Sequence, residues 1–366
     1  MNSLKWLPVL ALAAACGQPP ADDASDTDDL STSTLSMEMV RANPALAPHV
    51  VVPEGVRVNG RARPLPEAQV HAQGGFHGPV HEGDFLYGAN QLGQFLQLAD
   101  PAIVYGDRPH ASTSRQPGDL FADDGKMTWT DVAQGYLGDC YFASSLSAVL
   151  FADKSHAIAR RMIVPHTDAK GVIDSYTVTF FQATGRKVAI QVDPDLPHRN
   201  TDGIVFYMSS TQNKPGYEEW APSLVEKAYA TWHKSYNVIG NGGTAADAIF
   251  ALTGKTTRSY SGKNSRVVDA IEAAGKDGRA QVACTYGDKD GVKYPVGIYS
   301  DHCYGLRGVR REGNSVFVQL RNPWGPGSAT DKEPTEPPTA DGVFDGLFDL
   351  PAADFQRLYA TVDIVP

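Results

Sequence analysis

The sequence predicts an α+β fold in which a helix carrying a cysteine faces a β-sheet carrying a histidine and an asparagine. Three observations lead to this prediction. A glycine-containing loop at residues 134–139 runs into a helical pattern that begins near Cys140. The C-terminal part of the chain holds several short segments with strand character. His302 opens one of these segments, and Asn322 directly follows another.

The helix near Cys140 is predicted from helical spacing of apolar residues, which recur at Ala143, Leu146, Val149 and Leu150. Asp139 precedes the pattern, and its carboxylate is a candidate N-cap for the first turn. Cys140 would then lie at the positive end of the helix dipole, which favours a thiolate over a thiol.

Further elements are expected along the chain. A hairpin is predicted at residues 175–192, with its turn at Thr184 and Gly185. Pro222 fits the start of a helix over residues 222–234, and Thr244 can cap a helix after the glycine-rich residues 240–243. A short helix is expected at residues 265–274. Strands are expected at residues 280–285, 302–309, 315–321 and 359–365.

The residue types around Cys140 favour covalent catalysis. A lone cysteine among apolar residues is more often an inert core thiol, so the hypothesis rests on a combination. Gln134, six residues earlier, can supply an amide donor to an oxyanion hole. His302 can act as a base, and Asn322, 322 − 302 = 20 residues further on, can orient its imidazole ring.

Four ordered blocks of the sequence resemble the calpain-type cysteine peptidases. They are QGYLGDCYF at residues 134–142, PSLVEKAYA at residues 222–230, DHCYG at residues 301–305 and LRNPWG at residues 320–325. Gly242 and Gly243 match a further pair of glycines in the family pattern. The similarity covers roughly residues 85–366. It implies a papain-like core with a cysteine subdomain at residues 84–243 and a histidine and asparagine subdomain at residues 244–366.

The resemblance also implies a function. The expected enzyme is an endopeptidase that cleaves protein substrates through a thioester acyl-enzyme. Its catalytic residues would be Cys140, His302 and Asn322, with Gln134 at the oxyanion hole and Trp324 covering the contact between histidine and asparagine. The chemistry itself requires no cofactor. We expect a monomer.

Three residues depart from the family pattern, and two other functions stay open. Asp301 stands in place of a glycine, Cys303 in place of an alanine and Tyr141 in place of a tryptophan. A carboxylate at position 301 could raise the pKa of the adjacent His302 or misdirect its ring. The alternatives are a catalytically inactive binding module of the same fold and a transglutaminase-like acyl transferase.

The resemblance suggests one calcium site. Asp131 and Glu219 match the acidic ligands of the family's first site, and carboxylates are suitable ligands for Ca²⁺. Surface carboxylates that happen to align are the alternative interpretation. The second family site is not expected, because Ser328 replaces its glutamate.

Composition and the N-terminal residues suggest an exported protein. The formal net charge of −10 argues against a general nucleic-acid binder, and no apolar run is long enough to span a membrane. Residues 1–15 resemble a signal peptide, with Cys16 as the lipidated residue of a bacterial lipoprotein; plain secretion is the alternative. Residues 16–83 are expected to form an acidic and proline-rich tether. A disulfide between Cys284 and Cys303 is left open.

Overall fold

The computed structural model describes residues 99–104, 107, 111–115, 118–121, 125–200, 203, 205, 207–210, 219–325 and 345–366, together with the backbone of residues 92–97. The predicted signal peptide, the lipidation of Cys16 and the tether lie outside the described residues. No helix in the described part of the chain has the length and apolar character needed to cross a membrane.

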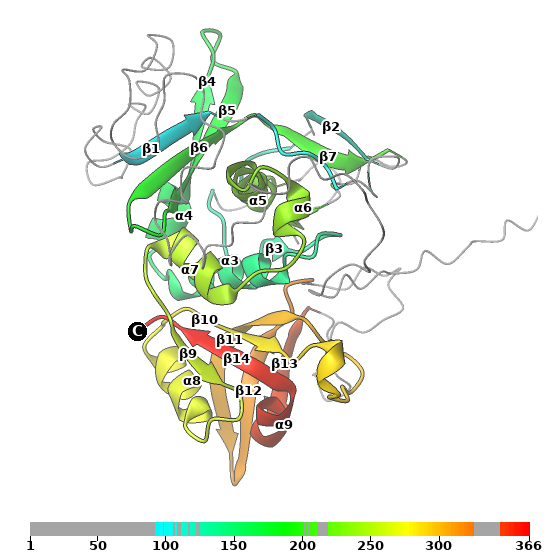
Figure 1. Ribbon diagram of the computed structural model, residues 1–366. Coiled ribbons are helices and arrows are strands. Elements are labelled where there is room, and N and C mark those ends of the chain that lie inside the picture. Colours follow the sequence, from blue (N-terminus) through cyan, green and yellow to red (C-terminus); the bar gives the residue numbers. More distant parts are fainter. Residues whose placement is uncertain are drawn as a thin grey trace, which may run out of the picture.

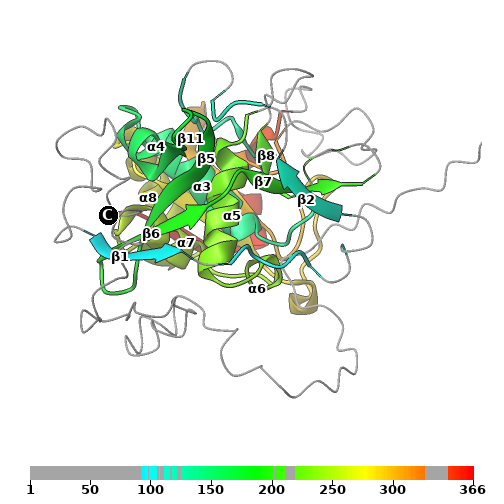
Figure 2. The same cartoon turned by 90° about the horizontal axis from the view of Figure 1, so that it is seen from above.

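The first group of elements includes the helix that starts at Cys140, and this helix lies where the group meets the strands β10 and β11 (Figure 1). A four-stranded sheet has the order β1-β6-β5-β4, in which β1 and β6 are parallel and the other neighbours are antiparallel. Helix α5 lies against β5 and β6 (Figure 2). The elements are β1 (Leu92–Gln97), β2 (Ala111–Arg115), β3 (Val132–Ala133), α3 (Cys140–Ala152), α4 (Ala157–Met162), β4 (Ile163–Thr167), β5 (Ile173–Phe181), β6 (Lys187–Val192), β7 (Asp195–Arg199), β8 (Ser209–Ser210), α5 (Ala221–Trp232), α6 (Tyr236–Ile239) and α7 (Ala245–Thr253).

The second group of elements is built on a six-stranded antiparallel sheet with the order β13-β12-β11-β10-β14-β9. Helix α8 packs on β11 and β14, and α9 packs on β12, β13 and β14. The elements are β9 (Arg258–Ser261), α8 (Val267–Lys276), β10 (Gln281–Thr285), the 3₁₀ helix η4 (Asp288–Asp290), β11 (Cys303–Glu312), β12 (Ser315–Arg321), β13 (Leu347–Pro351), α9 (Ala352–Leu358) and β14 (Tyr359–Ile364).

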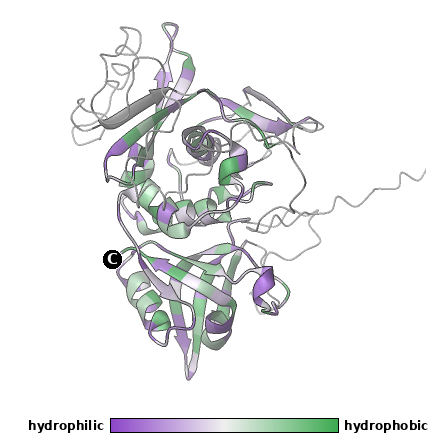
Figure 3. Cartoon of the chain, in the orientation of Figure 1, coloured by the Kyte–Doolittle hydropathy of each residue, from purple (hydrophilic) through white to green (hydrophobic). Residues whose placement is uncertain are grey.

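The six-stranded sheet has a hydrophobic core on each of its faces because side chains alternate along a strand. Val282 and Cys303 belong to the core around α3, whereas Ala283 and Tyr304 belong to the core beneath α8 and α9. Figure 3 shows hydrophobic residues along both α3 and the strands of this sheet. The sheet therefore presents one face directly to the helix that carries Cys140.

Most predicted elements are present, and α3 differs from its prediction in burial. The hairpin of β5 and β6, the proline in the first turn of α5 and the cap by Thr244 are confirmed. The pattern in α3 predicted one apolar face, but every residue from Cys140 to Leu150 is buried. The reason is that α3 lies between α7 on one side and β10 and β11 on the other.

Candidate active site

Cys140 is the first residue of α3, and it is fully buried. The main-chain carbonyl of Asp139 accepts hydrogen bonds from the amides of Phe142 at 2.7 Å and Ala143 at 3.0 Å. The Asp139 carboxylate makes no capping hydrogen bond, so the predicted side-chain cap is wrong. Cys140 nevertheless lies in the first turn of α3, at the positive end of the helix dipole.

Gln134 is held in the loop that precedes α3. Its Nε2 donates to the carbonyl oxygen of Leu137 at 2.6 Å, which closes the loop into a tight turn. Its main-chain amide donates to the carbonyl oxygen of Pro323 at 2.8 Å. The second bond connects this loop to the segment directly after Asn322. The assignment of Gln134 to an oxyanion hole stays a prediction.

His302 directly precedes β11, and its main chain is held by Thr285 of β10. The Thr285 amide donates to the His302 carbonyl at 2.9 Å, and the His302 amide donates to Thr285 Oγ1 at 3.0 Å. Asp301, one residue earlier, has a left-handed backbone with φ of 49°. Aspartate tolerates this conformation better than most residues other than glycine. This explains how Asp301 can occupy a position where the resembled family has glycine.

The imidazole of His302 is buried and hydrogen-bonded to Asn322. Its Nε2 lies 2.9 Å from Asn322 Oδ1, which also accepts the main-chain amide of Trp324 at 3.2 Å. Because Oδ1 is an acceptor, Nε2 carries the proton and Nδ1 is the basic nitrogen. Burial lowers the pKa of His302 to about 4, and the hydrogen bond to Asn322 acts in the opposite direction. The Trp324 ring lies 4.8 Å from the imidazole, between ring centroids.

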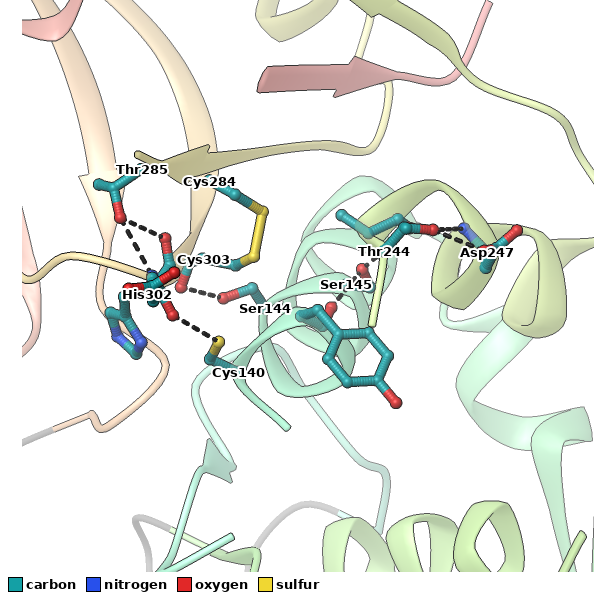
Figure 4. Close-up of a disulfide and its surroundings, with 12 residues drawn as sticks. Cys140, Ser144, Ser145, Thr244, Asp247, Cys284, Thr285, His302 and Cys303 are labelled. Carbon is teal, nitrogen blue, oxygen red and sulfur yellow. Dashed lines mark hydrogen bonds between the residues drawn. A yellow bond between two sulfur atoms is a disulfide. The ribbon is translucent and has the colours of Figure 1, made fainter. Parts of the chain in front are cut away.

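The two sides of the site meet at Cys140. Cys140 Sγ lies 4.0 Å from the main-chain oxygen of Asp301, the residue before His302 (Figure 4). The Asp301 carboxylate instead accepts a hydrogen bond from the Asp288 amide at 2.9 Å. Asp301 does not contribute to the shift of the His302 pKa, which is governed by burial and by Asn322. The predicted rise in the His302 pKa is therefore wrong, since burial lowers that pKa and the Asp301 side chain is engaged by the neighbouring turn.

Arg321 connects the two sides and was not predicted from the sequence. It is buried at the end of β12 and donates to the carbonyl oxygen of Val132 at 2.7 Å and to Ser147 Oγ at 3.1 Å. Burial lowers its pKa to about 10, whereas the negative charge of Asp131 raises it. Its place in the LRNPWG block, next to Asn322, is the signal that sequence reasoning left unused.

Two buried carboxyl groups lie behind Cys140. Asp139 and Glu226 of α5 are both fully buried, and they interact with each other. Burial raises the pKa of Asp139 to about 7 and raises that of Glu226 well above its usual range. Both Glu226 oxygens accept the Met208 amide at 3.1 Å. Sequence reasoning missed this pair, because nothing local connects position 139 with position 226.

The proposed calcium ligands, Asp131 and Glu219, are both buried, and their segments are joined by strand pairing. They are therefore not the surface carboxylates of the alternative interpretation. Asp131 is 2% exposed, and its Oδ2 accepts a hydrogen bond from Thr128 Oγ1 at 2.8 Å. Glu219 is 0% exposed and accepts from Ser210 Oγ at 3.3 Å. Strand pairing places Ser210 opposite Val132, the residue after Asp131. Within the described residues, no three acidic, histidine or cysteine side chains form a metal-binding group.

The mixed helix and sheet structure is compatible with the core of a cysteine peptidase. A cysteine at a helix start contacts the residue before a histidine, and that histidine is bonded to an asparagine. Comparison with known families gives the same class. The model of the calpain family of cysteine proteases matches residues 84–334, more than half of the chain. The chain therefore belongs to the calpain family.

Curated relatives carry calpain names and are much longer than this chain. It is 32% identical over 258 residues to the rice calpain-type cysteine protease ADL1, covering 64% of this chain and 11% of that protein. It is 30% identical to Drosophila Calpain-B, covering 61% of this chain and 25% of that protein. It is 27% identical to human Calpain-9, covering 67% of this chain and 37% of that protein.

Proposed function

We propose that this protein is a cysteine endopeptidase that cleaves protein substrates through Cys140, His302 and Asn322. One observation carries the proposal. The His302 ring is hydrogen-bonded through Nε2 to Asn322 at 2.9 Å. The main-chain oxygen of the adjacent residue Asp301 lies 4.0 Å from Cys140 Sγ. A base with its second nitrogen fixed, next to a cysteine at a helix start, is suited to activating a thiol.

Each residue has a defined role in the proposed reaction. His302 Nδ1 takes the Cys140 proton, and the thiolate attacks the substrate carbonyl to form a thioester. The imidazolium then protonates the leaving amine, and water hydrolyses the thioester. Asn322 keeps the ring oriented, and the Trp324 ring shields their contact from water. The Cys140 amide and Gln134 are the proposed oxyanion donors.

Digestion of casein tests this proposal. Purified protein, assayed with a thiol reductant, is expected to release peptides, and Cys140→Ala is expected to release none above background. A labelled primary amine in the same reaction identifies acyl transfer to amines. Wild-type cleavage by Cys140→Ala, or amine incorporation without peptide release, would contradict the assignment.

Calcium is proposed as a structural ion at Asp131 and Glu219. Their chemistry fits, because both side chains are buried carboxyl groups and carboxylate oxygens are ligands that Ca²⁺ accepts. The remaining ligands would be main-chain oxygens or water. When bound, the ion supplies positive charge that stabilises two carboxylates close to the segment of Gln134.

Thermal unfolding tests the calcium proposal independently of activity. Excess chelator is expected to lower the Tm by several degrees, and added Ca²⁺ is expected to restore it. Asp131→Asn should have a lower response to Ca²⁺ than the parent, whereas Asp277→Asn, a change at an exposed carboxylate, should respond as the parent does. An identical Tm with chelator and with Ca²⁺ would contradict the site.

A further inference from the structure

The disulfide between Cys284 and Cys303 lies at the junction of the six-stranded sheet and α3. The two cysteines stand directly opposite each other in the antiparallel pair β10 and β11. Val282, two residues before Cys284 and hence on the same face, belongs with Cys303 to the core around α3. The disulfide is thus on the face of the sheet that packs against α3, and Figure 4 shows it beside this helix.

The residues next to the disulfide hold the main chain of His302. Thr285 follows Cys284, and His302 precedes Cys303. Thr285 Oγ1 accepts from the His302 amide at 3.0 Å and donates to the carbonyl oxygen of Tyr299 at 2.8 Å. The Thr285 amide donates to the His302 carbonyl at 2.9 Å. The disulfide therefore joins Cys284 to Cys303, and these two hydrogen bonds join the adjacent pair, Thr285 and His302.

Helix α3 is attached at this same point. Ser144 lies one helical turn after Cys140, and its Oγ donates to the carbonyl oxygen of Cys303 at 2.8 Å. Cys303 is thus linked to β10 by its sulfur and to α3 by its main chain. It lies between the segment of His302 and the helix of Cys140.

We propose that Cys284, Cys303 and Thr285 form a positioning clip that fixes His302 relative to Cys140. The inference rests on the proposed function, because positioning matters only if His302 is the base. With the disulfide replaced by two alanines, the strands are held here by hydrogen bonds alone and the contact with α3 loses two sulfur atoms. A displacement of about 1 Å at a reacting group can lower the rate roughly 10²-fold.

Two sets of variants test the clip. The double variant Cys284→Ala/Cys303→Ala removes the covalent link, and Thr285→Val removes the hydroxyl at nearly constant volume. Each is expected to lower kcat roughly tenfold to a hundredfold with little change in KM, since the substrate contacts stay in place. Thr285→Ser keeps the hydroxyl and is expected to remain within about twofold of the parent. Mass spectrometry of the unreduced digest verifies that the parent disulfide is intact during the assay.

A second measurement does not depend on proteolysis. After mild reduction that frees Cys140 and leaves the Cys284–Cys303 disulfide intact, iodoacetamide alkylates the Cys140 thiolate, and the pH dependence of the alkylation rate reports how strongly His302 promotes that thiolate. The clip variants are expected to react at higher pH than the parent, with the Cys140 peptide followed by mass spectrometry. Thr179→Val is the matched control. It removes a buried threonine hydroxyl in β5 that has no hydrogen-bond partner among the described residues.

The outcomes separate the clip from the proposed function. Clip variants with lower Tm but with parental kcat and alkylation profile would show a purely structural disulfide and overturn the positioning role. A parent that cleaves no protein would overturn the proposed function, and an altered alkylation profile in the variants would still support the clip. Equal losses in Thr285→Val and Thr179→Val would also contradict it.

Discussion

The histidine of the candidate site is held by hydrogen bonds to its neighbours, whereas two buried carboxyl groups lie together on the cysteine side. His302 is hydrogen-bonded to the side chain of Asn322, and the main-chain amide of Asn322 donates to the carbonyl oxygen of Gly346 at 2.8 Å. Behind Cys140, the carboxyl groups of Asp139 and Glu226 are buried against each other, and burial raises the pKa of both. The histidine side is thus built for a fixed geometry. The cysteine side has a charge that changes near neutral pH.

The largest expected effect comes from removing either member of the Cys140 and His302 pair. His302→Ala should lower kcat/KM on the order of 10⁴-fold or more, because Cys140 loses its base. Cys140→Ala/His302→Ala should be no slower than either single variant, since the two residues act as one unit. Initial rates of casein cleavage measure this. A double variant much slower than both singles would mean that the two sides act independently.

An intermediate effect is expected from Arg321, which connects the sides. Arg321→Met keeps most of the side-chain volume but leaves the Val132 carbonyl and the Ser147 hydroxyl without this donor. Unsatisfied buried groups cost about 1–3 kcal/mol each, so for these two groups we expect a loss of roughly 2–6 kcal/mol in the free energy of unfolding. Urea unfolding measures the loss. Arg310→Met, at an exposed ion pair on β11, is the control and should have a much smaller effect on stability, because water screens exposed ion pairs.

The smallest effect sharpens the contrast in charge. The pKa of Asp139 is raised from 3.8 to about 7. Between these two pH values the carboxyl group keeps its proton in the folded state and has lost it in the unfolded state. The associated stability is fully present below about pH 4 and is lost as the pH rises through 7. Asp139→Asn removes this ionisation, so its Tm should exceed that of the parent by a few degrees at pH 8 and match it near pH 4. A parallel fall of both Tm curves between pH 4 and 8 would contradict the raised pKa.

The histidine side could be predicted better than the cysteine side because its contacts are local in sequence. His302 directly precedes β11 and Asn322 directly follows β12, so both lie at the open end of this antiparallel hairpin. The strands predicted at residues 302–309 and 315–321 were enough to bring them together. Asp139 meets Glu226 only through the packing of α5, which no local pattern specifies. The cap by Asp139 was wrong for this reason, since its carboxyl is buried beside Glu226 rather than in the first turn of α3.

Some structure was missed because the sequence signal was weak. The strand β13 and the helix α9 occupy only Leu347–Leu358, and no strand or helix was predicted there. The pairing of Cys284 with Cys303 was left open, because strand register decides which residues face each other and spacing does not. Thr285 gave no signal at all, since its role depends on the same register.

The contact between Tyr141 and Gly243 has a consequence for how this chain can vary. A Cβ at position 243 would lie 2.5 Å from two ring atoms of Tyr141, which is closer than real atoms approach. Tyr141 is 4% exposed and cannot swing into solvent without opening the core beside Cys140. Any residue larger than glycine at position 243 therefore requires a smaller side chain at position 141. The two positions are expected to change together across homologous sequences, although they lie about a hundred residues apart.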